Sequence, residues 1–300
     1  MSDSHRRGAR MMRWVAGVGA VLLLLVVYGV GVEPRFVLDE RRYPATLPEL
    51  GEPWQSAEIA VFSDLQVGMW WSNTGMVERV VDRVVEEEPA AALVPGDFVY
   101  SEAPGVSAQV DTVTELLAPL AEAGVPTFIV LGNHDHAVEA SEELTAAFEE
   151  MGFVVLHNQA AEVPGTRVGA DEDEPLYVVG LAATRPGLTD VDAALSEVPS
   201  GAPRGVMMHN PTVFPRLPAG AAPLAVAGHT HCGQVALPGL ERWSYIALTE
   251  EEKVVADGFA PEEHGASGNG LFVTCGIGFS IVPVRINAAP QVVFFELQAS

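Results

Sequence analysis

The sequence predicts an α/β protein built as a four-layer αββα sandwich of two mixed β-sheets, preceded by one N-terminal transmembrane helix. Three observations lead to this prediction. An apolar run without charges lies near the N-terminus. Strand and helix patterns then alternate, which implies parallel strands covered by helices. The second half of the chain has many short apolar runs and few helical patterns, which implies a second, mixed or antiparallel sheet.

The composition allows such a fold and excludes some functions. The chain has 300 residues, of which 48% are hydrophobic, enough to bury a substantial core. It has 40 acidic and 16 basic residues, for a net charge of −24. Because nucleic-acid binding usually needs a basic surface, no nucleic acid partner is expected. The two cysteines, Cys232 and Cys275, are too few for a fold held together by disulfides.

The N-terminal segment divides into three parts before the folded domain. Residues 1–13 form a basic tail with four arginines, and residues 14–32 carry no charge over about the length that crosses a bilayer. The positive-inside rule then places the tail in the cytoplasm and the domain, residues 58–300, outside a single-pass cell-membrane anchor. A cleaved signal peptide is the alternative, but the run is long for one and no clear cleavage site follows. Residues 33–57, which are rich in proline, are expected to form a linker or a strap along the domain.

Within the domain, hydrophobic periodicity and turn residues predict each element. Residues 75–88 form a helix with one stripe of valines, ended by Pro89, and glycines end the helices expected at 106–123 and 139–151. The predicted strands are 59–63, 91–94, 127–131, 153–156, 176–181, 205–209, 224–227, 271–275 and 292–297.

Polar residues directly follow five of the predicted strands. They are Asp64 and Gln66; Asp97; Asn133, His134 and Asp135; His209; and His229 and His231. Each position alone is explained as well by a turn, a helix cap or a solvated loop. Because the carboxyl ends of parallel strands meet at one edge of a sheet, the five positions together predict a single site.

The types of side chain in this group predict metal binding. Carboxylate oxygens mixed with imidazoles suit Mn, Fe or Zn better than calcium or a thiolate site. The donors are too many for one ion. The group therefore predicts a centre with two divalent or transition metal ions.

In order and spacing, these residues resemble the motifs of the calcineurin-like metallophosphoesterases. The motifs of that family are Asp-x-His, Gly-Asp, Gly-Asn-His-Asp/Glu, His and Gly-His-x-His, and the resemblance covers about residues 58–297. The segments 209–215 and 228–234 are most similar to a branch of membrane-associated bacterial phosphodiesterases. The resemblance implies the metallophosphoesterase fold and the following metal ligands: Asp64 and His231 for the first ion, Asp97 for both, and Asn133, His209 and His229 for the second.

The resemblance also implies a reaction. The family hydrolyses phosphoesters, with a hydroxide shared by the two metals attacking phosphorus in line. His134 would lie beside the scissile phosphate and protonate the leaving group, and Asp135 would orient His134. The expected substrate is a phosphoester, with a lipid or cell-envelope compound suggested by the anchor. A nucleotide or protein phosphatase of the same fold is the alternative within this class.

Two features depart from the family pattern. Gln66 stands where the family usually has a histidine; its amide oxygen is a weaker ligand, which raises the alternative of a catalytically impaired binding or scaffold protein. Cys232 and Cys275 both follow strands at the active edge. They could form a disulfide, Cys232 could approach a metal, or the two could be unrelated buried residues. Residues 239–270 are a candidate substrate lid.

Overall fold

The structure is a computed structural model. It describes residues 3–103, 105–184, 187–246 and 248–300, with side chains from residue 10 onward; position 247 of the candidate lid lies outside these ranges. The helices are α1 (Asp3–Val27), α2 (Glu33–Phe36), α3 (Thr74–Glu87), α4 (Val106–Glu122), α5 (Asn133–Ala137), α6 (Ser141–Glu150), α7 (Val191–Ser196) and α8 (Glu241–Ser244). The strands are β1 (Asp39–Leu47), β2 (Glu58–Val61), β3 (Ala91–Pro95), β4 (Thr127–Val130), β5 (Val154–Val155), β6 (Gln159–Glu162), β7 (Tyr177–Leu181), β8 (Arg204–Met208), β9 (Leu224–Ala227), β10 (Gly258–Phe259), β11 (Leu271–Val273) and β12 (Gln291–Ala299).

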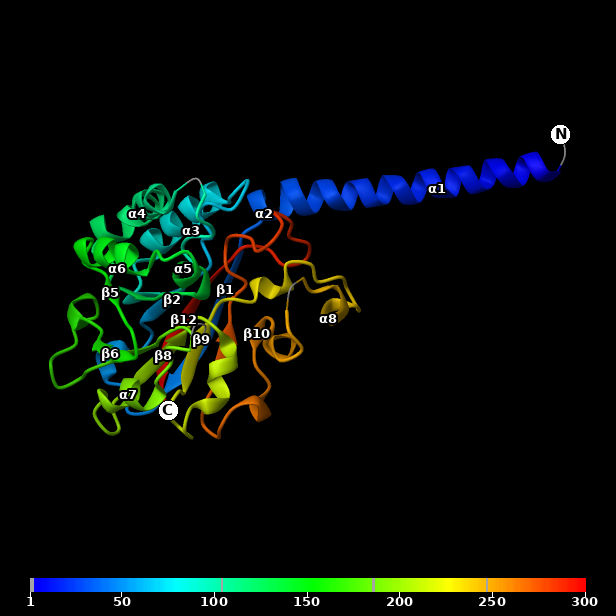
Figure 1. Cartoon of the computed structure of the whole chain (residues 1–300). Helices are drawn as coiled ribbons and strands as arrows, with labels where there is room; N and C mark the ends of the chain where they lie inside the picture. Colours follow the sequence, from blue (N-terminus) through cyan, green and yellow to red (C-terminus); the bar gives the residue numbers. More distant parts are fainter. Residues whose placement is uncertain (1–2, 104, 185–186, 247) are drawn as a thin grey trace.

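The strands form two six-stranded sheets, both mixed, as the sequence predicts (Figure 1). The first has the order β1-β12-β2-β3-β4-β5, with β12 antiparallel to β2 and the other neighbours parallel. The second has the order β10-β11-β9-β8-β7-β6, parallel in its centre and antiparallel at both edges. The edge strands β6 and β10 were not predicted, because both are short and weakly apolar.

Three layers of buried side chains hold the sheets and helices together. Between the sheets, Phe128 and Phe295 pack with Met207 and Phe272. The outer face of the first sheet packs against α3, α4 and α6, where the valine stripe of α3 is buried. The outer face of the second sheet is covered more thinly, by α7 and by a 3-10 turn, η4 (Pro211–Arg216). The fourth layer of the expected sandwich is therefore made of short helical turns.

The expectation that residues 33–57 form a linker is wrong, because β1 lies in this segment. β1 pairs in parallel with β12 from Asp39 opposite Gln291 to Leu47 opposite Ala299. Ala45 and Leu47 are buried, and the ring of Tyr43 lies 5.4 Å from that of Phe272. The prolines suggested a linker, but β1 is an edge strand, where a missing backbone N–H costs little.

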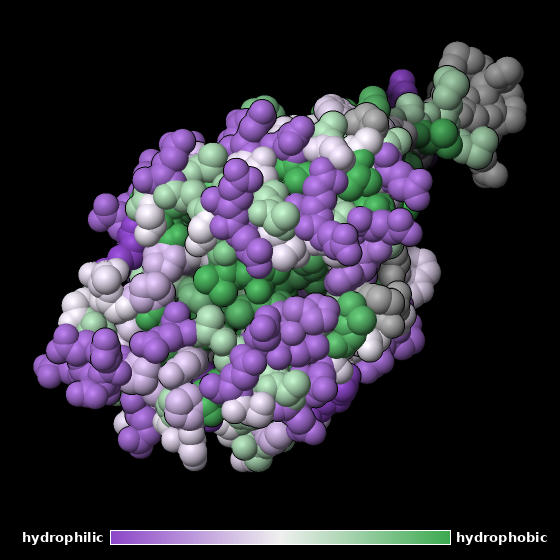
Figure 2. Space-filling model, turned by 60° about the vertical axis from the view of Figure 1, so that its left-hand side comes forward, coloured by the Kyte–Doolittle hydropathy of each residue, from purple (hydrophilic) through white to green (hydrophobic). Residues whose placement is uncertain are grey.

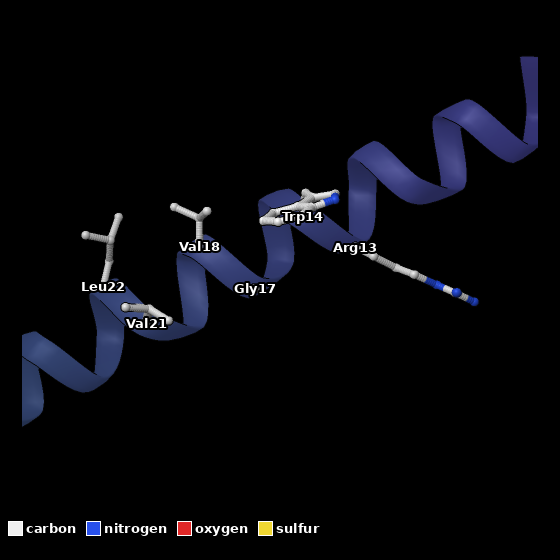
Figure 3. Close-up of a pocket in the computed structure, with 6 residues that line it drawn as sticks. All are labelled: Arg13, Trp14, Gly17, Val18, Val21 and Leu22. Carbon is white, nitrogen blue, oxygen red and sulfur yellow. The ribbon is translucent and has the colours of Figure 1, made fainter.

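Helix α1 projects away from the rest of the described chain (Figure 1). It continues through a π-helical turn, η1 (Tyr28–Val32), into α2. In Figure 3, Trp14, Val18 and Leu22 project from one side of the helix and Arg13 from the other. Only 6% of its most apolar stretch is buried. By length and composition, α1 is a signal sequence or a membrane anchor.

The surface of the domain is largely hydrophilic on the face that Figure 2 shows, around an apolar hollow near its middle. This agrees with the net charge of −24. Most of the exposed large apolar side chains lie instead on α1 and on the segment that joins it to the domain.

Candidate metal centre

The loops that follow β2, β3, β4, β8 and β9 converge at one edge of the two sheets. Their close approach depends on glycine at two positions. A Cβ atom on Gly132 would lie 2.1 Å from Asp97 Oδ1, and one on Gly228 would lie 2.5 Å from Asp64 Oδ2. Any other residue at these positions would displace a carboxylate of the site.

Five residues of the site have left-handed backbone conformations that L-residues rarely adopt. The φ angles are 55° for Asp64, 52° for Gln66, 58° for Asp97, 74° for His229 and 50° for His231. Each such residue costs on the order of 1 kcal/mol, and such costs persist mainly where function needs the geometry. Five such residues in loops that meet at one edge agree with a functional role for these loops.

Asp97, His209 and His229 form the most compact group of potential metal ligands. One ligand atom from each lies within 4.8 Å of the others. His209 Nε2 is 3.1 Å from Asp97 Oδ2 and 3.1 Å from Asn133 Oδ1, and His229 Nδ1 lies 3.2 Å from His209 Nε2. The structure thus brings together all four residues expected at the second metal position.

The electrostatics of this group favour a cation. Burial alone would lower the pKa of His209, but the charge and hydrogen bond of Asp97 raise it to about 10. Burial would conversely raise the pKa of Asp97, which His209 holds below its usual range. A field that holds a proton on a buried imidazole equally attracts a metal ion, which would replace that proton.

Glu252 is a member of this site that was not predicted from the sequence. It lies in a 3-10 turn, η6 (Glu252–Val255), within the candidate lid. Its Oε1 is 2.9 Å from His229 Nε2, so His229 donates through Nε2 and presents Nδ1 to the group. This hydrogen bond lowers the pKa of the buried Glu252 to about 2. In the sequence, no feature distinguishes Glu252 from its acidic neighbours Glu250 and Glu251, so its role could not be predicted.

The residues expected at the first metal position are arranged more loosely. Asp64 is fully buried, and its Oδ1 is 3.6 Å from His231 Nε2. Gln66 donates from Nε2 to Asp97 Oδ2 at 2.9 Å, while its buried Oε1 has no hydrogen-bond partner among the described residues. Arg285, also not predicted from the sequence, is buried beside His231, with Nη2 3.3 Å from Nδ1.

The residues of the first position nevertheless offer a donor atom of the kind that suits a metal ion, the buried Oε1 of Gln66. A buried amide oxygen without a partner is costly, and a cation within its reach would satisfy it. Arg285 opposes this only in part, because its guanidinium also donates to the carbonyls of Cys275, Gly278 and Ala288.

His134 lies beside this group and is half-buried. Its backbone N–H donates to Asp97 Oδ1 at 2.8 Å. Its ring stacks on that of Tyr100 with the centroids 4.9 Å apart, and its Nδ1 is 3.2 Å from the Tyr100 carbonyl oxygen. His134 is therefore held by Tyr100, which follows β3 on the same edge.

The expectation that Asp135 orients His134 is wrong. Its carboxylate accepts four backbone N–H groups, from Gly132 at 2.8 Å, Asp97 at 3.0 Å, Phe98 at 2.8 Å and Val99 at 3.1 Å. Adjacent residues on a helix do not face each other, so Asp135 on α5 cannot reach the His134 ring. Asp135 instead fixes the loop that carries Asp97. Burial and the charge of Asp97 raise the pKa of Asp135 to about 7.

Cys232 and Cys275 form a disulfide, which joins the histidine loop to the end of β11. Their Cα atoms are 4.7 Å apart. Because both sulfurs are bonded, Cys232 is not a metal ligand in this state. Of the three alternatives open from the sequence, the structure has the disulfide.

Comparison with known proteins agrees with this geometry. The family model described as calcineurin-like phosphoesterase matches residues 57–233. Phosphodiesterase YaeI of Escherichia coli K12 is 29% identical over 71% of this chain and 72% of its own length. The uncharacterized metallophosphoesterase YkuE of Bacillus subtilis 168 is 22% identical over 81% of this chain and 79% of its own.

Among solved structures, TT1561 of Thermus thermophilus aligns with 74% of this chain and 90% of its own. The TM-score is 0.45 and the sequence identity 13%. At this level of similarity, the relationship rests on the sequence match rather than on the superposition.

Proposed function

This chain belongs to the calcineurin-like phosphoesterases and is a metal-dependent phosphoesterase, and on that premise we propose that it is a membrane-anchored phosphodiesterase with a two-metal centre. The match to phosphodiesterase YaeI supports cleavage of diesters. The observation that carries the metal centre is the convergence of Asp97, His209 and His229 on one point.

We assign Asn133 to the second metal position with these three residues, and Asp64, Gln66 and His231 to the first, with Asp97 shared. The unpartnered Oε1 of Gln66 supports its role as a ligand and speaks against the alternative of a silent scaffold. The second position is the better formed of the two. Bound metal ions would supply positive charge for the phosphate oxygens and a water molecule of lowered pKa.

The side chains of the protein have separate tasks around that chemistry. His134 is placed beside the metal ligands by Tyr100 and Asp97, where its ring can bind a phosphate oxygen or give a proton to the leaving alcohol. Asp135 holds the Asp97 loop, and Glu252 sets the orientation of His229. Hydrolysis of a diester adds one water across a P–O bond and yields a phosphomonoester and an alcohol.

Two observations support an uncleaved anchor and a domain outside the cytoplasm. The end of the apolar helix is part of the fold: Gly29 and Glu33 are buried, and the Gly29 carbonyl accepts the Arg285 N–H at 2.8 Å. Cleavage after residue 32 would remove these contacts at Gly29. The Cys232–Cys275 disulfide is typical of proteins in an oxidising compartment.

Hydrolysis of bis-p-nitrophenyl phosphate by the purified full chain tests the proposal. We expect activity that depends on added Mn²⁺ or Zn²⁺, is lost with a chelator and falls by about 100-fold or more in Asp97→Asn. Elemental analysis of the same sample would give the number and identity of the metals. Absence of hydrolysis in a metal-loaded, folded sample would contradict the proposal.

A further inference from the structure

The end of the N-terminal helix is bound to two loops: the loop after β2, which carries Asp64 and Gln66, and the loop between β11 and β12. Glu33, 2% exposed, accepts the N–H groups of Asn287 at 2.9 Å and Ala288 at 2.7 Å. Arg35 donates to the Ser72 carbonyl at 2.7 Å and to Asn73 Oδ1 at 2.9 Å. A Cβ atom on Gly29 would lie 2.5 Å from the Ile286 side chain, so this junction is tightly packed.

The loop between β11 and β12 is hydrogen-bonded to the backbone around Asp64, a residue of the first metal position. The Ile277 N–H donates to the Ser63 carbonyl at 2.9 Å, and the Gly278 N–H donates to the Asp64 carbonyl at 2.6 Å. Asn73 ties the two loops together, since its Nδ2 donates to the carbonyls of Pro34 at 2.9 Å and Ile277 at 3.0 Å. The position of the helix relative to the metal centre is therefore fixed.

Large apolar side chains are exposed on the helix end and on the loops near it, and we call them the rim patch. Its members are Tyr28, Val32, Phe36, Trp70, Trp71 and Ile281, which are between 39% and 71% exposed. The first three recur every four residues along the helix end. The Arg35 guanidinium lies 5.1 Å from both the Trp71 and Phe279 rings, which joins the helix end to both loops.

Two contacts connect the rim patch to His134. The Ile281 N–H donates to the Tyr100 hydroxyl at 3.2 Å. The Tyr100 ring in turn stacks on that of His134. A surface that covers the rim patch would therefore lie near His134 and the metal centre.

We propose that the rim patch docks onto the bilayer that holds α1, and that the substrate is a phosphodiester in the headgroup layer of that membrane. The inference rests on the proposed function and on α1 as an uncleaved anchor. The bilayer is the surface expected to cover the patch, because α1, the proposed anchor, continues through η1 and α2 into the patch without a break (Figure 1). Tryptophan side chains favour the membrane interface. Because the domain is anionic, attraction to the headgroups does not explain docking, and the apolar rim patch supplies the driving force.

Tryptophan fluorescence tests the docking. The full chain carrying Trp14→Phe and Trp243→Phe, reconstituted in phosphatidylcholine vesicles, keeps only Trp54, Trp70 and Trp71. Bromine-labelled lipid should quench most emission from the two rim tryptophans but not that from Trp54, which is 1% exposed in the core. Unquenched rim tryptophans would overturn docking. If they were also inaccessible to iodide, a second copy or another protein would be the occupant.

Hydrolysis tests the substrate class. A phosphatidyl-p-nitrophenol reporter in the same vesicles has the leaving group of bis-p-nitrophenyl phosphate. Trp70→Ala combined with Trp71→Ala should lower turnover of the vesicle reporter at least about tenfold, because each indole can bury on the order of 100 Å² at the interface. Turnover of the soluble diester should not change. Leu188→Ala, an exposed apolar residue three positions before α7, is the matched control and should affect neither.

The outcomes separate this inference from the proposed function. If the wild-type protein hydrolysed the soluble diester but not the vesicle reporter, the substrate class would be wrong. An equal loss on both substrates in the double variant would show that the tryptophans support the fold rather than docking. If the wild-type protein hydrolysed neither, the proposed function itself would fail, and the fluorescence measurement would still decide the docking.

Discussion

Glu252→Gln tests whether a carboxylate outside the metal cluster sets the metal affinity of the second position. Glu252 Oε1 is 2.9 Å from His229 Nε2, and Oε2 accepts the Thr249 N–H at 2.7 Å. Glutamine has one acceptor oxygen, so it can keep only one of these bonds and turns its own N–H groups toward the other donor. Because the residue is 3% exposed, water cannot replace the lost acceptor.

The expected effect is a loss of metal affinity of about 10–100-fold, which is typical when the outer partner of a metal-binding histidine is removed. This corresponds to about 1.4–2.7 kcal/mol of binding free energy. The loss should lie toward the upper end of this range. The variant removes both the negative charge near the cation and the bond that fixes which nitrogen of His229 faces the metal.

The measurement is a chelator-competition titration of the full chain with Zn²⁺ and Mn²⁺. The matched control is Glu250→Gln, which removes a carboxylate two residues away whose side chain is 91% exposed and bonded to Lys253. We expect no measurable change in its metal affinity. Unchanged affinity in a natively folded Glu252→Gln protein would refute the reasoning and leave Glu252 as a structural residue of the lid segment.

Three further predictions concern other parts of the site. Gln66→His should keep or raise metal occupancy, since imidazole is the stronger ligand. A lower metal occupancy in elemental analysis of this variant would contradict the prediction. Replacing Cys232 and Cys275 by serine should lower the free energy of unfolding by about 4 kcal/mol in denaturant titrations, given their separation of 43 residues, and the unreduced wild type should show no free thiol. In metal-free protein, Glu252 should stabilise the fold above pH 4.5, its ordinary pKa, and lose this contribution as pH falls toward about 2. The acid unfolding of Glu252→Gln should therefore lack that component.

The positions of the expected metal ligands could be predicted from the sequence because each follows a short apolar strand. A parallel sheet delivers such residues to one edge whatever the details of the loops. Asp97, Asn133, His209 and His229 accordingly lie together in the structure. The two mixed sheets follow from the same alternation of apolar runs and turns.

The parts that could not be predicted depend on contacts between distant segments. The prolines of residues 33–57 indicated a linker, and only pairing with β12 at the other end of the domain makes a strand of residues 39–47. Glu252 reaches His229 from a loop with several other acidic residues. The resemblance to the family assigned Asp135 to His134, but the geometry of a helix turns adjacent side chains apart.

The pairing of β1 with β12 also constrains how the protein is made. If α1 is an anchor, β1 is the first strand to be translocated and remains unpaired at the membrane surface, whereas β12 is synthesised near the end of the domain. β12 is bonded to both β1 and β2, so the first sheet cannot close until residues 291–299 have been translocated. Until then β1 and β2 expose unpaired edges beside the bilayer, where stalled chains would associate with one another or be degraded. If α1 is an anchor, the first sheet is therefore completed only after the whole domain has crossed the membrane.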